Sequence, residues 1–192
     1  MTKNKMLLAL LAVVFLALPQ SLCAQFNWKY TVEKGKIVTE VPKRAPGQTT
    51  ALELRTPKMP VVRVGFVGLG MRGPGAVERW MHIPGIEVVA LCDYEAKRAE
   101  ACQKILRDNS MPAAAIYSGA EGYKELCKRK DIDLVYIATD WDHHFLVAKC
   151  AMENGKHAAI EVPSAINLRE IWTLIDLSEK TRLHCVMLEN CC

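Results

Sequence analysis

The sequence carries no large excess of charge of either sign. Its 25 Lys and Arg residues and 21 Asp and Glu residues leave a formal net charge of +4, which falls to +2 if Lys3 and Lys5 leave with the export signal described below. Basic and acidic residues are interleaved, as on an ordinary solvated surface. We therefore expect no nucleic-acid partner. The sequence also contains no internal repeat and no low-complexity segment.

Metal-binding cysteine patterns are missing, although cysteine itself is frequent. None of the eight cysteines forms a CxxC pair, and no Cys/His spacing suits zinc, so we expect no metal site. If Cys23 is removed with the export signal described below, seven cysteines remain, an odd number that cannot all form disulfide pairs. Five others occupy positions typical of buried strands or helices, where cysteine behaves as a small hydrophobic residue: Cys92, Cys102, Cys127, Cys150 and Cys185.

No apolar run is long enough to span a bilayer comfortably. The continuous apolar stretch at residues 6–18 falls short of the roughly 20 residues that a transmembrane helix needs. Two lysines precede it and a small-residue site follows, so we interpret residues 1–24 as a signal peptide cleaved after Ala24. A lipid anchor on Cys23 is the alternative. Either prediction gives a periplasmic or secreted protein with no stable membrane span.

Residues 25–60 lack sustained periodicity and are punctuated by Pro42, Pro46, Gly47, Pro57 and Pro60. This composition predicts an extended arm or linker, with a short strand around residues 36–41. We expect Trp28 and Tyr30 to pack on the following domain or on a partner subunit, so a homo-oligomer is an open expectation. Nothing in this segment carries chemistry.

The most informative pattern runs from Val61 to Asp93. An apolar, β-branched run is followed at once by Gly68-Leu69-Gly70-Met71-Arg72-Gly73, then by a helix, a second strand and an acid. In a dinucleotide-binding turn, Gly68 allows the sharp bend, Gly70 lets the backbone approach a pyrophosphate, and Gly73 lets the helix pack closely on the strand. The helix N-terminus favours the phosphates. A glycine-rich turn that binds nothing is the alternative.

The acid after the second strand bears on the choice of cofactor. Asp93 is placed to accept hydrogen bonds from a ribose 2′-OH and would repel a 2′-phosphate, which favours NAD over NADP. Its offset from the glycines is about 20 residues or slightly more, as the fingerprint requires.

Strand and helix patterns alternate over the remainder of the chain. This alternation predicts an α/β fold, a doubly wound parallel sheet of the Rossmann type, over residues 61–192. A domain of about 130 residues can form its own core but is small for a whole enzyme, so we expect it to be truncated at its C-terminus. The expected helices cover residues 95–109, 119–129, 143–154 and 167–180, and the expected strands cover 114–117, 132–138, 157–162 and 183–189.

Ligands of such sheets bind beyond the carboxyl ends of the strands. The polar residues expected there, besides those named above, follow the later strands: Thr139 to His144, Glu161-Val162-Pro163 and Glu189-Asn190.

These motifs resemble a known group of enzymes. The fingerprint with Asp93, the segment Asp131 to Thr139, Trp141 and His144, and Glu161-Val162-Pro163 are similar to the glucose–fructose oxidoreductase and inositol dehydrogenase superfamily. The resemblance covers nearly everything from Val61 to Cys192. It implies an N-terminal Rossmann domain paired with a C-terminal α+β domain that binds a sugar, and that second domain is absent from this chain.

One departure narrows the resemblance. Ordinary sugar dehydrogenases of this group carry Glu-Lys-Pro after the fifth strand, with the lysine near the nicotinamide, whereas this chain has Val162 at the middle position. Together with Trp141-Asp142-His143-His144 and the segment 187–191, this resembles glycoside hydrolase family 109. The resemblance implies NAD contacts at Met71, Arg72, Asp93, Trp141, Asp142, His143, His144, Glu161, Val162 and Asn190.

The resemblance also implies a reaction. In family 109, bound NAD takes a hydride from C3 of an α-linked N-acetylgalactosamine, the C1 substituent leaves by elimination, and the hydride is returned after water adds. Such enzymes are exceptions to the paired-carboxylate mechanism of glycosidases. A redox-neutral cycle fits export, because it consumes no free NAD.

Several residues keep a structural interpretation beside the functional one. From the residues alone, Trp141 and His144 could form a lid and a polar contact on the loop facing the cofactor, His143 could point away from it, and Glu161 could bond within its loop. We expect His157 to be structural, and the sequence names no catalytic base. Three hypotheses remain: an exported NAD-dependent glycosidase with a carbohydrate substrate, an exported sugar oxidoreductase, and an inactive nucleotide-binding fragment.

Overall fold

The computed structural model describes residues 30–189. The chain divides into two compact units, residues 1–43 and 44–192, and each is described here by itself. The predicted signal peptide, Trp28, Asn190 and the two terminal cysteines lie outside the described residues.

The described part of the first unit is a β-hairpin. Strand β1 (Tyr30–Glu33) pairs antiparallel with β2 (Lys36–Thr39), so the strand predicted near residues 36–41 is present, and its partner had not been predicted. Lys34 and Gly35 connect the strands, and both have positive φ (50° and 75°). Two such residues make the tight turn whose twist matches that of paired strands.

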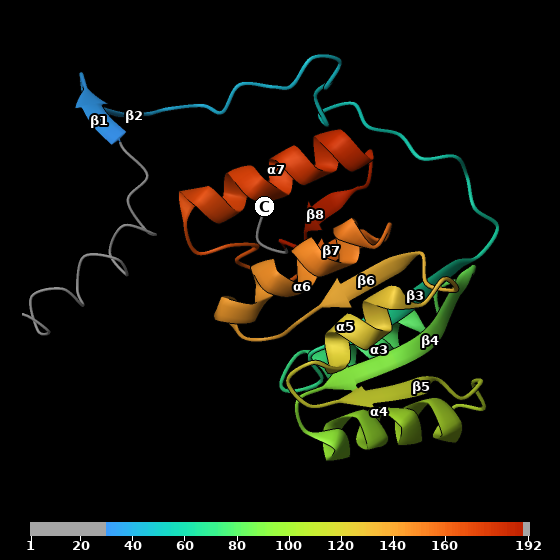
Figure 1. Cartoon of the computed structure of the whole chain (residues 1–192). Helices are drawn as coiled ribbons and strands as arrows, with labels where there is room; N and C mark the ends of the chain where they lie inside the picture. Colours follow the sequence, from blue (N-terminus) through green and yellow to red (C-terminus); the bar gives the residue numbers. More distant parts are fainter. Residues whose placement is uncertain (1–29, 190–192) are drawn as a thin grey trace, which may run out of the picture. The chain divides into compact units, whose positions relative to one another are not determined.

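The second unit is built on a six-stranded sheet in which every pairing is parallel (Figure 1). The strand order, β5-β4-β3-β6-β7-β8, reverses direction at β3, as in dinucleotide-binding folds. The predicted doubly wound α/β fold is therefore confirmed. The strands are β3 (Val62–Val67), β4 (Ile86–Asp93), β5 (Ala115–Ser118), β6 (Leu134–Ile137), β7 (His157–Ile160) and β8 (Cys185–Met187).

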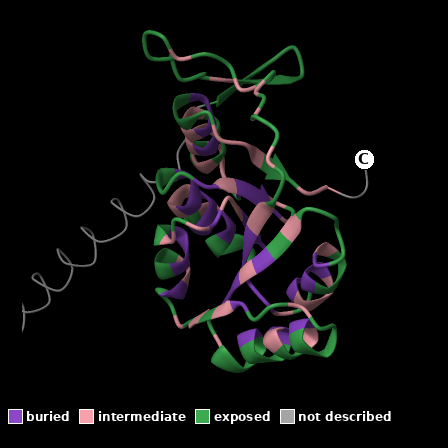
Figure 2. Ribbon diagram, turned by 90° about the vertical axis from the view of Figure 1, so that its right-hand side faces the viewer, coloured by how far each residue is buried: buried purple, intermediate pink, exposed green. Residues whose placement is uncertain are grey.

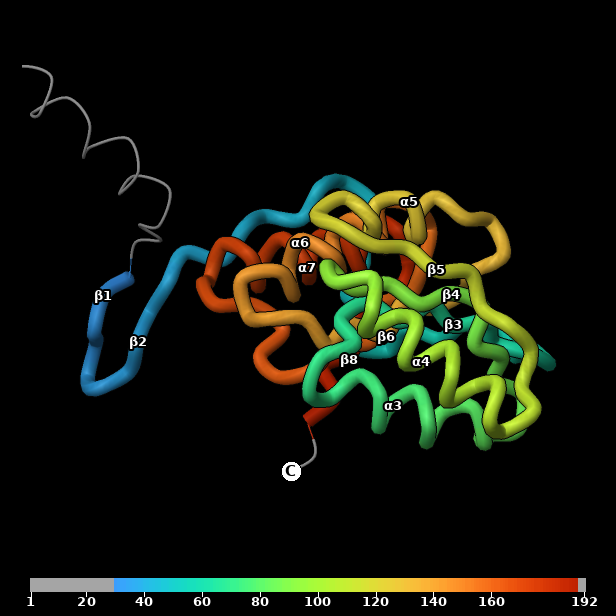
Figure 3. Tube along the Cα trace, turned by 90° about the horizontal axis from the view of Figure 1, so that it is seen from below, coloured from blue at the N-terminus to red at the C-terminus, as the bar shows by residue number. Residues whose placement is uncertain are grey.

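Five helices cover the two faces of this sheet. On one face, side chains of α3 and α4 pack with Phe66 and Leu91 of the sheet, and these two helices run side by side (Figure 3). On the other face, side chains of α5, α6 and α7 pack with Val135 and Ile160. The interior of the sheet is accordingly buried (Figure 2). The helices are α3 (Gly73–Trp80), α4 (Ala96–Asp108), α5 (Gly122–Lys128), α6 (Trp141–Glu153) and α7 (Leu168–Thr181).

Side-chain caps begin two of the five helices, α6 and α7, whereas α3, α4 and α5 have none. Asn167 caps α7, because its side-chain oxygen accepts a hydrogen bond from the Glu170 N–H (3.0 Å). The Glu170 carboxylate accepts from the Ile166 N–H instead of completing a capping box on Asn167. After α6, Gly155 adopts the left-handed conformation (φ 76°) that commonly ends a helix.

The start of α6 corrects a prediction. The helix begins at Trp141 and not at His143, because Asp140 is its N-cap and accepts a hydrogen bond from the His143 N–H (3.2 Å). Trp141 and His144 therefore lie in the first helical turn and not on a loop.

Residues 44–50 are fastened to α7. The Arg44 guanidinium donates two hydrogen bonds to the Glu179 carboxylate (2.7 and 2.8 Å), and Gln48 donates to Glu179 and Asp176. Arg182 donates to the carbonyl oxygens of residues 49 and 50. Part of the segment predicted to be a linker is thus bound to the sheet domain.

Three of the five cysteines that the sequence predicts to be buried are buried in the structure. Cys92, Cys102 and Cys127 are buried, Cys150 and Cys185 are half-buried, and all five are free thiols. Burial raises the pKa of Cys102 and Cys185 to about 11, so both stay protonated and pack as hydrophobic residues. Within residues 30–189, no group of His, Cys, Asp and Glu side chains is arranged to hold a metal ion, and no helix is long and apolar enough to cross a membrane.

Candidate dinucleotide site

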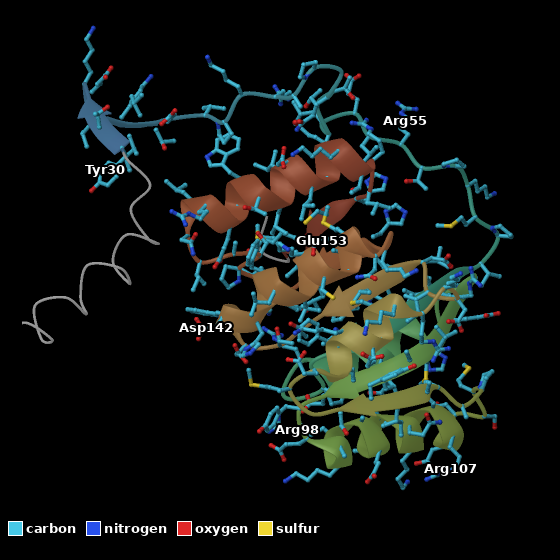
Figure 4. The ribbon with its side chains drawn as sticks, in the orientation of Figure 1. Tyr30, Arg55, Arg98, Arg107, Asp142 and Glu153 are labelled. Atoms are coloured by element: carbon cyan, nitrogen blue, oxygen red, sulfur yellow. The ribbon has the colours of Figure 1, made fainter. Side chains whose placement is uncertain are left out.

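A cleft of about 460 Å³ opens at the carboxyl ends of β3, β4 and β6. Arg98 and Asp142 lie toward this end of the sheet in Figure 4. The cleft is where a doubly wound sheet binds its ligands, because the crossovers on either side of β3 leave a crevice there. Six of the residues predicted for the cofactor line it: Gly68, Gly70, Met71, Arg72, Asp93 and His143.

The three fingerprint glycines have three different surroundings. Gly68 has a φ of +90°, and a Cβ at this position would lie 2.4 Å from the Ala138 carbonyl carbon at the end of β6. A Cβ on Gly73 would lie 2.3 Å from the Gly68 carbonyl oxygen, so the helix and the turn are in close contact. A Cβ on Gly70 would meet only the Arg98 side chain, at 3.6 Å. Gly70 therefore presents bare backbone to the cleft, which suits a pyrophosphate.

Asp93 holds this turn in place. Its carboxylate is 5% exposed, and it accepts hydrogen bonds from the Leu69 N–H (2.6 Å) and the Glu95 N–H (2.9 Å). Arg98 lies 3.5 Å from the same carboxylate. An ionised carboxylate has about four acceptor positions, so two backbone donors leave capacity for a ribose hydroxyl. The structure thus gives Asp93 a second role, as the clamp of the glycine turn, which the sequence did not predict.

The electrostatics at the α3 end of the cleft favour an anion. Arg72 and Arg98 line it, and the first turn of α3 begins at Gly73 with no acidic residue and no side-chain cap. The N-terminal N–H groups of a helix carry a partial positive charge that attracts phosphate. Arg98 also forms an ion pair with Glu95 (2.8 Å), which keeps the guanidinium at the rim of the cleft.

The first turn of α6 supplies the opposite wall. His143 lines the cleft, and its ring Nδ1 lies 2.8 Å from the Asp140 carboxylate. Burial opposes ionisation of Asp140, but the hydrogen bonds and charge of His143 outweigh it and lower the pKa of this carboxyl. Trp141 is 64% exposed and Asp142 is exposed, and neither is among the residues that line the cleft.

His144 is buried within the protein and does not line the cleft. It is 1% exposed, and its ring nitrogens lie 2.6 Å from the Pro163 carbonyl oxygen and 3.1 Å from the Thr139 carbonyl oxygen. The imidazole therefore ties the segment after β7 to the segment after β6. In this position it orients the two segments that the sequence assigned to the cofactor.

The segment after β7 carries the remaining predicted contacts. The Glu161 carboxylate accepts a hydrogen bond of 2.5 Å from the Tyr136 hydroxyl, and Val162 is 39% exposed. Pro163 follows a cis peptide bond. Glu161 and Val162 do not line the 460 Å³ cleft. They follow β7, the neighbour of β6, and so lie at the same carboxyl edge of the sheet, one strand farther from β3.

Three residues shape this edge in ways that the sequence did not predict. Asp140 was expected only as one of the polar residues after the strand, and its position directly before the apolar helix pattern is typical of an N-cap. Arg98 gave a weaker signal, as a basic residue in the first turn after the acidic strand end. No sequence pattern marks Tyr136, because its partner is 25 residues away.

Comparison with known proteins agrees with this geometry. The family model described as "Oxidoreductase family, NAD-binding Rossmann fold" matches residues 62–189. The chain belongs to this family. The matched segment begins with β3 and includes every strand of the parallel sheet, so the family assignment rests on the same residues that build the cleft.

The relatives also include glycosidases. Glycosyl hydrolase family 109 protein 5 of Phocaeicola vulgatus is 67% identical over 180 residues, which is 92% of this chain and 35% of that protein. Glycosyl hydrolase family 109 protein 1 of Bacteroides thetaiotaomicron is 57% identical over 167 residues, 86% of this chain and 36% of that protein. The resemblance to family 109 is confirmed, and this family member spans about a third of the length of these relatives.

Solved structures of the same fold include a cofactor complex. The myo-inositol dehydrogenase of Lactobacillus casei, solved with NAD(H) and myo-inositol, is 28% identical with a TM-score of 0.54, over 62% of this chain and 33% of that one. An NAD-binding protein from Listeria innocua is 26% identical with a TM-score of 0.57, over 67% and 35%.

Proposed function

We propose that this chain is the NAD-binding part of an exported glycosidase that acts on α-linked N-acetylgalactosamine. The observation that carries the proposal is the combination of a cleft lined by the dinucleotide fingerprint with Val162 at the position where the related sugar dehydrogenases have lysine. The 67% identity to a family 109 protein supports it.

The residues around the cleft divide the binding of NAD between them. The open backbone at Gly70 and the N-terminus of α3 suit the pyrophosphate, and Arg72 and Arg98 supply positive charge beside it. Asp93 offers its remaining acceptor positions to the adenosine ribose, and its negative charge disfavours a 2′-phosphate. Glu161 and Val162 stand at the end of β7, on the side of the glycine turn toward which the nicotinamide half would extend.

The chemistry would be redox-neutral overall. When bound, NAD would supply a hydride acceptor for C3 of the sugar. The ketone at C3 would acidify the C2 proton, so that a base could remove it and the C1 substituent could leave by elimination, and the hydride would return after water adds. This chain's own residues bind and orient the cofactor. An exported enzyme gains from such a cycle because it needs no supply of free NAD, and residues 1–24 have the pattern of a signal peptide.

The first experiment measures NAD and NADP binding to the purified chain by isothermal titration calorimetry. We expect NAD to bind and NADP to bind at least tenfold more weakly. The Gly70→Val variant is expected to lose binding, and Gly47→Val, which removes a glycine outside the cleft, serves as its control. Absence of NAD binding by the wild-type chain would overturn the proposal.

The second experiment tests the reaction in a chimera. Residues 62–189 replace the aligned segment of the 67% identical P. vulgatus protein, and the unaltered P. vulgatus protein is the control. We expect release of nitrophenol from its α-N-acetylgalactosaminide with no net formation of NADH. Stoichiometric NADH formed with free N-acetylgalactosamine would instead support the sugar oxidoreductase. A chimera that binds NAD but does neither, beside an active control, would support the inactive fragment.

A further inference from the structure

The Tyr136 side chain lies in a buried aromatic cluster on the α3 face of the sheet. It is 2% exposed, and its ring centroid lies 5.0 Å from that of Phe66 and 5.1 Å from that of Trp80. A phenylalanine ring would fill the same space and make the same contacts. The hydroxyl group is therefore not explained by packing, since burying a polar group is costly unless it finds a partner.

The partner of this hydroxyl is the Glu161 carboxylate. The Tyr136 hydroxyl donates to Oε1 of Glu161 over 2.5 Å, a short bond of the charge-assisted kind. Burial and the contact with Glu161 both raise the pKa of Tyr136, so the phenol remains a donor at any physiological pH. Among residues 30–189, the structure gives the Glu161 side chain no other hydrogen bond. The second carboxylate oxygen is thus left for a ligand.

This pair lies on the same edge of the sheet as the cleft. Tyr136 is in β6, which pairs with β3 on one side and with β7 on the other, so the end of β7 lies about 10 Å from the glycine turn after β3. That distance is within the span of a dinucleotide. The charge of Arg72, which lines the cleft, also acts on the Tyr136 phenol. The pair is therefore close to the site but beyond the part that holds the adenosine.

We propose that Tyr136 is a positioning residue for the cofactor: its buried hydroxyl fixes the Glu161 carboxylate so that the free oxygen binds the nicotinamide half of the dinucleotide. The inference rests on the proposed NAD binding. Loss of the Tyr136 hydroxyl should therefore weaken binding of the nicotinamide half alone, because the adenosine half is held by the separate contacts of Asp93 and the glycine turn.

The test compares two ligands, NAD and ADP, because ADP lacks the nicotinamide and its ribose. In the purified chain, Tyr136→Phe is expected to weaken NAD binding about tenfold and to change ADP binding less than twofold. Glu161→Gln is expected to do the same, and the double variant is expected to lose no more than either single one. Tyr117→Phe, which removes a phenol hydroxyl from β5 of the same sheet, should change neither affinity.

Each other outcome is decisive. An unchanged NAD affinity in Tyr136→Phe overturns the inference. Equal losses for NAD and ADP, accompanied by a lower Tm, also overturn it, because they show a structural role only. Wild-type protein that binds ADP but gains nothing from the nicotinamide half would exclude the role of Tyr136 and leave the adenosine site intact. Wild-type protein that binds neither ligand would overturn the proposed function itself.

Discussion

The carboxyl edge of the sheet is held in two different ways at its two halves. At the ends of β3 and β4, the backbone sets the shape: glycines adopt conformations that other residues resist, and Asp93 accepts hydrogen bonds from backbone N–H groups. At the ends of β6 and β7, side chains set the shape, through Tyr136 with Glu161 and through His144 with two carbonyl oxygens.

This difference has a consequence for function. Phosphate and ribose are common to all dinucleotides, and a half-site built from backbone presents the same donors whatever the neighbouring side chains are. The half-site at β6 and β7 depends on side chains, which substitution can change without disturbing the turn. Differences of reaction within the family are therefore expected at the second half-site, where this chain has Val162 instead of lysine.

Replacing Gly68 by alanine should break the backbone half-site with the largest effect. The substitution adds a Cβ 2.4 Å from the Ala138 carbonyl carbon and forces a positive φ on a residue with a side chain. We expect a loss of about 3 to 4 kcal/mol in the free energy of unfolding, measured by urea denaturation. Gly119→Ala is the matched control, because its φ is also positive (+81°) but its Cβ would meet open space. It should cost about 1 to 2 kcal/mol. Equal losses would show that contact with β6 is unimportant.

The second largest effect is expected when the carboxylate of each half-site, Asp93 or Glu161, is replaced by an amide. The two substitutions should destabilise the protein to different extents. In Asp93→Asn, one oxygen that accepts from the backbone becomes an NH₂ group facing an N–H donor, inside the protein. We expect about 2 kcal/mol of destabilisation. Glu161→Gln keeps an acceptor for Tyr136 at the more exposed half-site, so its loss should stay below about 1 kcal/mol. Chemical denaturation of both variants at pH 7 measures this, and a larger loss for Glu161→Gln would reverse the comparison.

The difference between the two half-sites also explains which features could be predicted from the sequence. The alternation of strands and helices, the positive φ of Gly68, the contact of Gly73 with Gly68 and the cap at Asn167 depend on neighbours close along the chain, and the structure has them. The approach of Gly68 to Ala138 is not local and was not predicted. The bonds of Tyr136 to Glu161 and of His144 to Pro163 join residues 25 and 19 positions apart. Such contacts depend on strand pairing and on the packing of α6, which no periodic pattern encodes.

Two further differences from the sequence predictions have opposite physical origins. The attachment of Arg44 and Gln48 to α7 joins residues more than 120 positions apart, so no local pattern indicates it in the segment predicted to be an extended arm or linker. The predicted start of α6 is wrong by two residues, because the capping residue Asp140, and not the first apolar residue of the helix pattern, sets where the helix begins. The second signal is local and therefore readable from a single sequence.

His144 offers a smaller test within the side-chain half-site. In His144→Gln, a flexible amide replaces a buried, rigid ring whose nitrogens lie within hydrogen-bond distance of two carbonyl oxygens. A ring with one N–H donates to one of them, and the amide is not held in the place of the ring, so this hydrogen bond should be lost. We expect a loss of about 1 to 1.5 kcal/mol in the free energy of unfolding. His143→Gln is the matched control from the adjacent position, where the side chain is largely exposed, and it should change stability by less than about 0.5 kcal/mol. Similar values for the two variants would contradict a fastening role for His144.

The smallest expected effect concerns Asp140 and depends on pH. The pKa of Asp140 is lowered in the folded protein, since the contacts with His143 outweigh the effect of burial. A lowered folded pKa stabilises the protein above the unfolded value of about 3.9, and this contribution disappears as the pH falls through the folded pKa. Asp140→Asn keeps the capping acceptor but removes the charge. Because the side chain is 65% exposed, we expect it to be less stable than wild type by only about 0.5 kcal/mol at pH 6, with no difference near pH 3. Urea denaturation at both pH values measures this, with Asp142→Asn from the same turn as control. A gap that persists at pH 3 would show that the charge of Asp140 is not the cause.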